Sequence, residues 1–238
     1  MHNLHILGVR VDNLNLEESL DKISSFLADG RQHYIVLPYA DFFVEAEKDS
    51  EFKEILNKAD LSLADGFGPV LFSPCFGEGL KGRVMGVDLV LALFEKFWDK
   101  NSFFLFGAAE GTAQATVDRL LQDHPFGKIV GMLNGFVADS AAIEKINKTK
   151  PEILLVGLGM PKQEKWIAQN LSKLLSVKLA IGVGGAFDFI SGRVRRAPKI
   201  VQRAGLEWLW RVVFYPSRWK KTWRSVIIFP WLAARSLF

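Results

Sequence analysis

The stretch Ile153–Trp166, ILLVGLGMPKQEKW, decides the fold class of this chain. Its first four residues are apolar and partly β-branched, which is typical of a strand covered on both faces. Gly157 and Gly159 follow, and glycines permit backbone torsions and close ligand approach that a Cβ would block. Pro161 suits the first turn of a helix. The stretch therefore predicts a buried strand, a glycine turn and a helix.

The start of that helix is a candidate phosphate site. Unpaired N–H groups and the positive end of the helix dipole meet at such a position, so an anion can bind there without a special side chain. A tight turn without a ligand explains Gly157 and Gly159 about as well. Gln163 adds a polar group that favours the binding site, whereas Lys162 and Lys165 are also explained by solvent exposure.

The alternation of strands and helices continues along the chain. Strands are predicted at residues 5–11, 34–37, 61–64, 102–106, 128–132, 153–156 and 179–183, and helices at 16–28, 42–58, 87–98, 112–122 and 141–147. This order predicts an α/β fold, a Rossmann-like and mostly parallel sheet with helices on both faces. Ligands of such sheets bind at the carboxyl ends of the strands. Glycine turns follow three predicted strands, at 107–111, 157–159 and 182–185, and Asp65 follows a fourth.

The composition indicates an ordered globular protein in a reducing compartment. The 238 residues, 49% hydrophobic and 24% charged, are enough for one α/β core with an extension. The single Cys75 excludes an internal disulfide, and the four histidines do not cluster with carboxylates at a zinc-like spacing, so no structural metal is expected. The N-terminus lacks the pattern of a signal peptide, which predicts a cytoplasmic location.

The last part of the chain differs from the rest in charge and aromatic content. Residues 193–238 contain eleven lysines and arginines and one acid, Glu207, whereas the preceding residues contain nineteen basic and twenty-five acidic side chains. Five of the seven tryptophans also lie in this part. We therefore expect two domains, an α/β body at residues 1–192 and a basic, aromatic helical appendage at 193–238.

The appendage is predicted to lie on a membrane surface. Helical spacing from Arg218 places Trp219 and Trp223 on one side and most cations on the other, which suits an anionic bilayer. The apolar run 226–234 is too short to span a bilayer and is broken by Pro230. Packing of the aromatics against the body or in a homo-oligomer is the second interpretation. Nucleic-acid binding ranks well behind, because base-stacking modules usually carry their aromatics on a sheet.

Five blocks of the sequence together resemble a known family. They are LADGFGPV (63–70), FLFGAAEG (104–111), VGLGMPKQEKWIA (156–168), IGVGGAFDFISGRVRRAP (181–198) and GLEWLWRVVFYPSR (205–218). In this order and spacing they are similar to the WecG/TagA/CpsF family of bacterial glycosyltransferases. The resemblance covers nearly the whole chain.

The resemblance implies an activity. It implies inverting transfer of an N-acetylmannosamine-type sugar (N-acetylmannosamine or its uronate) from a UDP-sugar donor to undecaprenyl-diphosphate-linked N-acetylglucosamine, in synthesis of wall teichoic acid or a related surface glycan. It also implies a peripheral protein at the inner face of the plasma membrane that needs no metal or cofactor. The chain contains no Asp-x-Asp pair, the usual way to hold a cation under a nucleotide diphosphate. Backbone N–H groups and Arg or Lys must then neutralise the phosphates.

Asp65 is the base that the resemblance assigns to this reaction. An inverting transfer needs a carboxylate to take the proton of the acceptor hydroxyl, and Asp65 follows a predicted strand. A turn or helix-capping aspartate is the alternative, since Asp-Gly is a common turn pair. Asp188 could accept ribose hydroxyls or cap a helix, and Gln163 matches a polar position of the family's donor pocket. The resemblance also implies substrate contacts at Gly66, Gly68, Gly107, Gly157, Gly159, Pro161 and Gly184, and cations that close over the donor diphosphate at Arg211, Arg218 and Lys221.

One segment departs from the family pattern. The family usually ends the strand before its second helix in Thr-x-Asn, whereas this chain has Leu37 and Tyr39 there. An apolar chain and a large phenol replace two short hydrogen-bonding groups, so the acceptor or sugar specificity, or activity itself, is expected to differ. Tyr39 can still contact substrate through its hydroxyl, and Asp41 could restore part of the lost polarity.

Two other classes of protein remain as alternatives. A nucleotide-dependent oxidoreductase shares the glycine turns, but the first strand is not followed by Gly-x-Gly-x-x-Gly and no acidic residue ends the next strand. A non-catalytic UDP-sugar or membrane-binding adaptor explains the basic tail and the altered Leu37 and Tyr39, but it does not explain Asp65 and Gln163.

Overall fold

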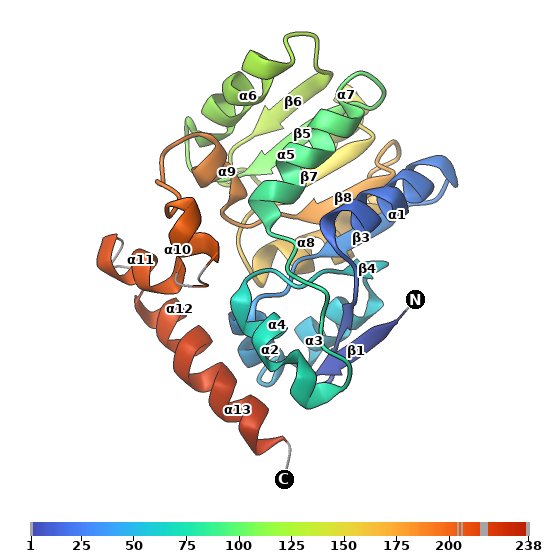
Figure 1. Cartoon of the computed structure of the whole chain (residues 1–238). Coiled ribbons are helices and arrows are strands. Elements are labelled where there is room, and N and C mark those ends of the chain that lie inside the picture. Colours follow the sequence, from blue (N-terminus) through green and yellow to red (C-terminus); the bar gives the residue numbers. More distant parts are fainter. Residues whose placement is uncertain (1, 204, 206, 215–218, 237–238) are drawn as a thin grey trace.

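The computed structural model describes residues 2–203, 205, 207–214 and 219–236, and at 199, 203, 211, 212, 220 and 221 it describes the backbone alone. Within this part, six parallel strands form one sheet in the order β4-β3-β8-β7-β5-β6 (Figure 1). The strands are β3 (His33–Val36), β4 (Leu61–Ser62), β5 (Phe103–Gly107), β6 (Ile129–Leu133), β7 (Ile153–Gly157) and β8 (Leu179–Gly182). The predicted Rossmann-like α/β fold is confirmed.

Helices cover both faces of this sheet, as the continuous apolar strands require. On one face Phe103 and Leu105 pack with α1 (Leu16–Ala28), α5 (Gly86–Phe97), α6 (Thr112–Asp123) and α9 (Ala186–Ile190). On the other face Phe104 and Phe106 pack with α7 (Asp139–Thr149) and α8 (Lys162–Asn170). Successive residues of a strand thus enter different core clusters, because side chains alternate across a sheet.

The first predicted strand, 5–11, is wrong as a single element. It is an antiparallel hairpin of β1 (Asn3–Ile6) and β2 (Val9–Asp12), which turns at Leu7 and Gly8 with φ of 49° and 76°. Its second strand reaches the sheet, because Asp12 bridges to Leu63 and accepts a hydrogen bond from the Ser62 N–H at 2.8 Å. The hairpin thereby lies beside the β4 edge as a separate two-stranded sheet.

The predicted helical stretch 42–58 is two helices rather than one. They are α2 (Ala40–Ala46) and α3 (Ser50–Lys58). Asp49 separates them: its side chain accepts a hydrogen bond from the Phe52 N–H at 2.9 Å and caps α3. The break gives α2 its own direction, and α2 is the helix on which the C-terminal tail packs.

The tail is helical along much of its length and lies beside α2 and α4 (Phe67–Phe72) (Figure 1). Its elements are α10 (Lys199–Arg203), α11 (Glu207–Phe214), α12 (Trp219–Trp223), the π-helical segment η4 (Arg224–Ile228) and α13 (Phe229–Arg235). The expected break at Pro230 does not occur. Pro230 lies in the first turn of α13, directly after the π-helical segment, and the helical conformation continues through it.

Part of the tail belongs to the core of the body. Phe229 is fully buried, with its ring centroid 5.4 Å from that of Phe43 in α2 and 5.6 Å from that of Phe72 in α4. Arg224 forms ion pairs with the buried Asp41 and with Glu45, each at 2.5 Å. One face of the tail therefore packs against the body, as the second interpretation expects, whereas contact of the tail with a membrane stays a prediction. The division into residues 1–192 and 193–238 stays a prediction.

Candidate active site

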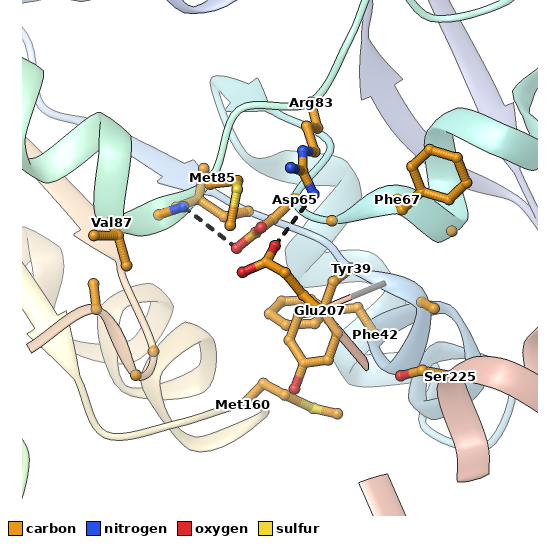
Figure 2. Close-up of a pocket in the computed structure, with 18 of the residues that line it drawn as sticks. Tyr39, Phe42, Asp65, Phe67, Arg83, Met85, Val87, Met160, Glu207 and Ser225 are labelled. Carbon is orange, nitrogen blue, oxygen red and sulfur yellow. Dashed lines mark hydrogen bonds and ion pairs between the residues drawn. The ribbon is translucent and has the colours of Figure 1, made fainter. Parts of the chain in front are cut away.

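A cavity of about 750 Å³ lies at the carboxyl ends of four strands. Its walls come from the segments that follow β3, β4, β7 and β8, from the start of α5, and from the tail. The crevice at the carboxyl ends of parallel strands is where ligands of open α/β sheets bind. Figure 2 shows Asp65, Arg83 and Met85 grouped at one part of this cavity and Tyr39, Phe42 and Met160 at another.

Asp65 is held by backbone groups from two directions. Its N–H donates to the carbonyl of Pro38 at 3.0 Å, which ties the segment after β4 to the segment after β3. Its Oδ2 accepts a hydrogen bond from the N–H of Gly86 at 3.4 Å (Figure 2). Gly86 is the first residue of the twelve-residue helix α5, so the helix dipole also favours a carboxylate at this point. The half-buried Asp65 lines the cavity.

The approach of α5 to Asp65 depends on Gly86. A Cβ at this residue would lie 3.3 Å from the side chain of Leu37 and 3.4 Å from the carbonyl oxygen of Val183. Both neighbours belong to the cavity wall. A larger residue at position 86 would therefore displace the wall or the helix start that holds Asp65.

Two arginines of the cavity wall were not predicted from the sequence. Arg196 makes a bidentate ion pair with Asp88 at 2.6 and 2.9 Å. The hydrogen bonds to Asp88, and then the charges of Glu207 and Asp65, raise the pKa of the Arg196 guanidinium. Arg196 thus brings a permanent positive charge close to the Asp65 carboxylate. It lies in the block 181–198 that carries the family resemblance, which was the available signal.

Arg83 is the second of these arginines, and it joins the cavity to the tail. Its guanidinium forms an ion pair with Glu207 at 3.2 Å (Figure 2) and donates to the carbonyl of Gln202 at 2.8 Å. Both partners come from the segment 193–238. No pattern around Arg83 marks it in the sequence, because it follows an irregular segment and its partners are about 120 residues away.

The two glycine turns after β7 and β8 are joined by Gln163. Its Oε1 accepts hydrogen bonds from the N–H of Gly159 at 3.1 Å and of Gly184 at 3.0 Å. These two N–H groups are therefore occupied by a side chain of the protein. Gln163 itself is 2% exposed, so its amide bonds to groups of the protein and hardly contacts solvent.

The structure brings most of the predicted binding residues to one place. The cavity is lined by Tyr39, Asp65, Gly66, Gly68, Gly157, Gly159, Gln163, Gly184 and Asp188. Pro161 and Gly107 are not among its described lining residues. Pro161 precedes α8 as its N-cap. Gly107 packs on the neighbouring strand, where a Cβ would lie 2.5 Å from the carbonyl carbon of Gly157, so contact between strands explains this glycine.

The side chains of the three predicted diphosphate-binding cations lie outside what the structure describes. Arg211 is in α11 and Lys221 in α12, with the backbone alone described, and Arg218 precedes α12. Their roles stay predictions.

The segment that departs from the family pattern forms an apolar part of the wall. Leu37 is 3% exposed and lines the cavity, and the ring of Tyr39 packs edge-on to Phe42 with centroids 5.0 Å apart. Asp41 does not restore the lost polarity, because it is buried in its ion pair with Arg224. The described residues contain no cluster of three or more His, Cys, Asp or Glu side chains that could hold a metal ion.

Comparison with known proteins shows the family to which this chain belongs. The model of the "Glycosyl transferase WecG/TagA/CpsF family" matches residues 4–238. The chain belongs to this family. The relatives of this glycosyltransferase include proteins named N-acetylglucosaminyldiphosphoundecaprenol N-acetyl-beta-D-mannosaminyltransferase from two Bacillus species and from Staphylococcus aureus. The one from Bacillus spizizenii is 34% identical over 83% of this chain and 77% of its own length. Those from Bacillus subtilis and Staphylococcus aureus are 32% and 29% identical, over 88% and 97% of this chain and 82% and 92% of their own lengths.

The tail of this family member exposes large aromatic side chains. Trp219, Trp223 and Trp231 are 55%, 54% and 57% exposed. None of the described helices is long and apolar enough to cross a membrane. At the cavity itself Phe67, Leu71 and Trp208 are also exposed and line its wall. Phe67 and Leu71 belong to α4 and Trp208 to α11, so the exposed apolar surface of the tail reaches the cavity wall at Trp208.

Proposed function

We propose that this chain transfers an N-acetylmannosamine-type sugar from a UDP donor to N-acetylglucosamine carried on a polyprenyl diphosphate. The observation that carries the proposal is the position of Asp65, in a cavity whose other walls are glycine turns and two arginines. The relatives named above act as N-acetylmannosaminyltransferases on N-acetylglucosaminyldiphosphoundecaprenol, which supports the same donor sugar and acceptor here.

The proposed reaction inverts the anomeric carbon and uses Asp65 as its base. The acceptor hydroxyl gives its proton to an Asp65 carboxylate oxygen while its own oxygen attacks the anomeric carbon of the donor sugar. The bond from that carbon to the diphosphate breaks on the opposite face, and UDP leaves with the electron pair. The Gly86 N–H holds one carboxylate oxygen in place, so the proton goes to a fixed position.

Positive side chains of the protein stabilise the leaving diphosphate in this proposal, without a metal. Arg196 and Arg83 are the described cations of the cavity wall. Each is also paired with a carboxylate, so each retains an orientation in the absence of ligand. The predicted Arg211, Arg218 and Lys221 would add charge from the tail. Charge-assisted bonds to phosphate oxygens are among the stronger hydrogen bonds in proteins.

A lipid-linked acceptor fits the apolar side chains around the cavity. A sugar alone needs polar partners, whereas Phe67, Leu71 and Trp208 present apolar surface at the same cavity. The exposed tryptophans of the tail would lie in the interfacial region of the bilayer, where amphipathic rings are favoured. We therefore propose a peripheral protein on the cytoplasmic face of the plasma membrane, where a soluble donor and a lipid acceptor can meet.

A non-catalytic UDP-sugar or membrane-binding adaptor is the second candidate. Leu37 and Tyr39 favour it, because they remove two short polar groups from the wall near Asp65. A UDP-sugar-binding adaptor differs from the transferase in turnover but not in binding of UDP, whereas a membrane-binding adaptor gives neither product nor UDP binding.

The two functions are separated by one assay. The full chain is incubated with UDP-N-acetylmannosamine and a short-chain diphosphate-linked N-acetylglucosamine, and the disaccharide product is detected by mass spectrometry, with and without a chelator. Product in both conditions supports the metal-independent transferase. UDP binding by calorimetry without product identifies the adaptor, and loss of UDP binding in the chelator contradicts metal independence.

A further inference from the structure

Glu164, next to Gln163 at the start of α8, is a buried acid that the proposed mechanism does not use. It has no measurable exposure, and its Oε1 accepts a hydrogen bond from the Gln163 Nε2 at 2.7 Å. Its Oε2 is buried without a hydrogen-bond partner among the described residues. A buried oxygen without a hydrogen-bond partner is destabilising, so Glu164 is not explained by stability alone.

The bond from Glu164 determines how the Gln163 amide is oriented. An amide can rotate by half a turn and exchange its oxygen and nitrogen. The acceptor at Glu164 requires the nitrogen on its side, so the oxygen faces the N–H groups of Gly159 and Gly184. The reversed amide would place its NH₂ against two N–H donors. Glu164 therefore makes Gln163 a bridge between the two turns.

Close packing leaves this bridge little room to move. A Cβ on Gly182, the last residue of β8, would lie 2.8 Å from the Gln163 Nε2 and 2.9 Å from the Glu164 Oε1. The end of β8 thus lies directly against the pair. Gly159 and Gly184 belong to the cavity wall, and both have a positive φ, 77° and 53°, which a loosened turn would readily lose.

We propose that Gln163 and Glu164 are positioning residues that hold the two glycine turns in the conformation that receives the nucleotide diphosphate of the donor. Glu164 orients Gln163, Gln163 joins the turns, and the turns form the wall on which the diphosphate lies. Neither side chain needs to touch the ligand. The inference rests on the proposed function, because it takes a nucleotide diphosphate as the ligand.

The test compares variants of this pair with a control on the same helix. Glu164→Leu removes the acceptor, Glu164→Gln keeps an acceptor oxygen, and Gln163→Asn keeps an amide that is too short to reach both turns. Asn170→Leu is the control, since Asn170 is a buried amide of α8 whose Nδ2 donates to the carbonyl of Trp166 and which does not line the cavity. The dissociation constant of UDP is measured by calorimetry and the melting temperature by thermal unfolding.

We expect Glu164→Leu and Gln163→Asn to weaken UDP binding about tenfold, as the loss of one or two ordinary hydrogen bonds would. Glu164→Gln should restore binding to within about twofold of the wild type, by the same reasoning. In the transfer assay the donor KM should rise while kcat changes little, because the turns bind the donor equally in the ground and transition states. Asn170→Leu should lower the melting temperature and leave UDP affinity unchanged.

Two results would overturn the inference while leaving the proposed function intact. In the first, Glu164→Leu and Gln163→Asn lose thermal stability as the control does but bind UDP like the wild type. In the second, Glu164→Gln binds as weakly as Glu164→Leu, so an acceptor oxygen is not what Gln163 needs. A wild-type protein that does not bind UDP would instead overturn the proposed donor, and the inference with it.

Discussion

Among single residues, Asp65 is the one whose substitution most directly tests the chemistry. Its backbone bond to Pro38 and its side-chain bond from Gly86 do not require a charge, so Asp65→Asn should keep its place. We expect turnover to fall about 10²–10⁴-fold, the usual loss for a general base. UDP affinity should stay near that of the wild type, because the base contacts the acceptor hydroxyl. Steady-state rates and calorimetry measure the two quantities, with the exposed Asp99→Asn as control. Near-normal turnover would return Asp65 to the role of a turn residue.

Glu164 gives a second residue-scale prediction, which concerns stability and pH. Burial raises the pKa of its carboxyl from 4.5 to about 7, against the opposing effect of the hydrogen bond from Gln163. The folded state therefore favours the protonated form, so the contribution of Glu164 to stability is complete below pH 4.5 and is lost as the pH rises to about 7. Across this window the loss amounts to about 3 kcal/mol.

The isosteric variant Glu164→Gln cannot ionise and should escape this loss. We expect the stability of the variant relative to the wild type to increase by about 3 kcal/mol between pH 4 and pH 8. Urea unfolding of both proteins at the two pH values gives the difference, in which the other titrating groups cancel. A difference that does not change with pH would show that Glu164 is ionised in the folded protein or reaches solvent.

The elements of the body could largely be predicted, because each follows from local physics. The apolar runs of β5, β7 and β8 stand out in a sheet covered on both faces, and glycines mark where strands end. The hairpin was missed because Leu7 adopts a positive φ, which a leucine rarely does. The α2–α3 boundary had a usable signal in Asp49, a good N-cap residue inside the charged run 45–51.

The helical tail was harder to predict at this scale. Ideal helical spacing places Val226 beside Trp219 and Trp223, yet Val226 lines the cavity while the two tryptophans are exposed. The π-helical segment Arg224–Ile228 contributes to this change, because its wider turn shifts the positions that follow. Such a shift depends on packing against α2 and cannot be read from the periodicity.

The ion pairs of Arg224 should decide how firmly the tail is held on α2. Arg224→Ala leaves Asp41, which is 1% exposed, without this cation. Removal of one partner from a buried pair costs about 3–5 kcal/mol, and since Arg224 is 28% exposed we expect a loss near or below the lower value. The double variant Asp41→Asn, Arg224→Ala should recover part of it, because no buried charge remains. Urea unfolding measures all three proteins, and equal losses in the single and double variants would contradict this account.

At the scale of the whole molecule, the candidate site is assembled from segments that are distant in the sequence. Local patterns predicted the glycine turns, and the family resemblance predicted the role of Asp65. Arg83 and its partner Glu207 are 124 residues apart, and only the fold brings them together. Gln163 was predicted as a ligand contact, whereas its bonds join two turns, because sequence marks a polar residue near a site but not the direction of its hydrogen bonds.

The exposed face of the tail can be tested for membrane binding, but the buried face limits which variants can be used. Deletion of residues 193–238 would also uncover Phe43 and Phe72, so loss of activity after truncation would mix folding with membrane binding. Substitution of exposed residues avoids this problem. Trp223→Glu and Trp231→Glu change side chains that are 54% and 57% exposed and should leave the melting temperature unchanged.

In these two variants we expect weaker sedimentation with anionic liposomes, because each places a charge where an aromatic ring would enter the bilayer interface. Transfer to an acceptor embedded in vesicles should fall together with sedimentation, whereas transfer to a soluble short-chain acceptor should continue at the wild-type rate.

Leu175→Glu is the control, since Leu175 is 86% exposed and precedes β8, whose opposite end faces the cavity. If the tryptophan variants sediment like the wild type, the exposed tail face is not the membrane contact. If they lose activity on the soluble acceptor as well, the tail acts on the site itself, and the membrane and the chemistry are coupled through α12 and α13.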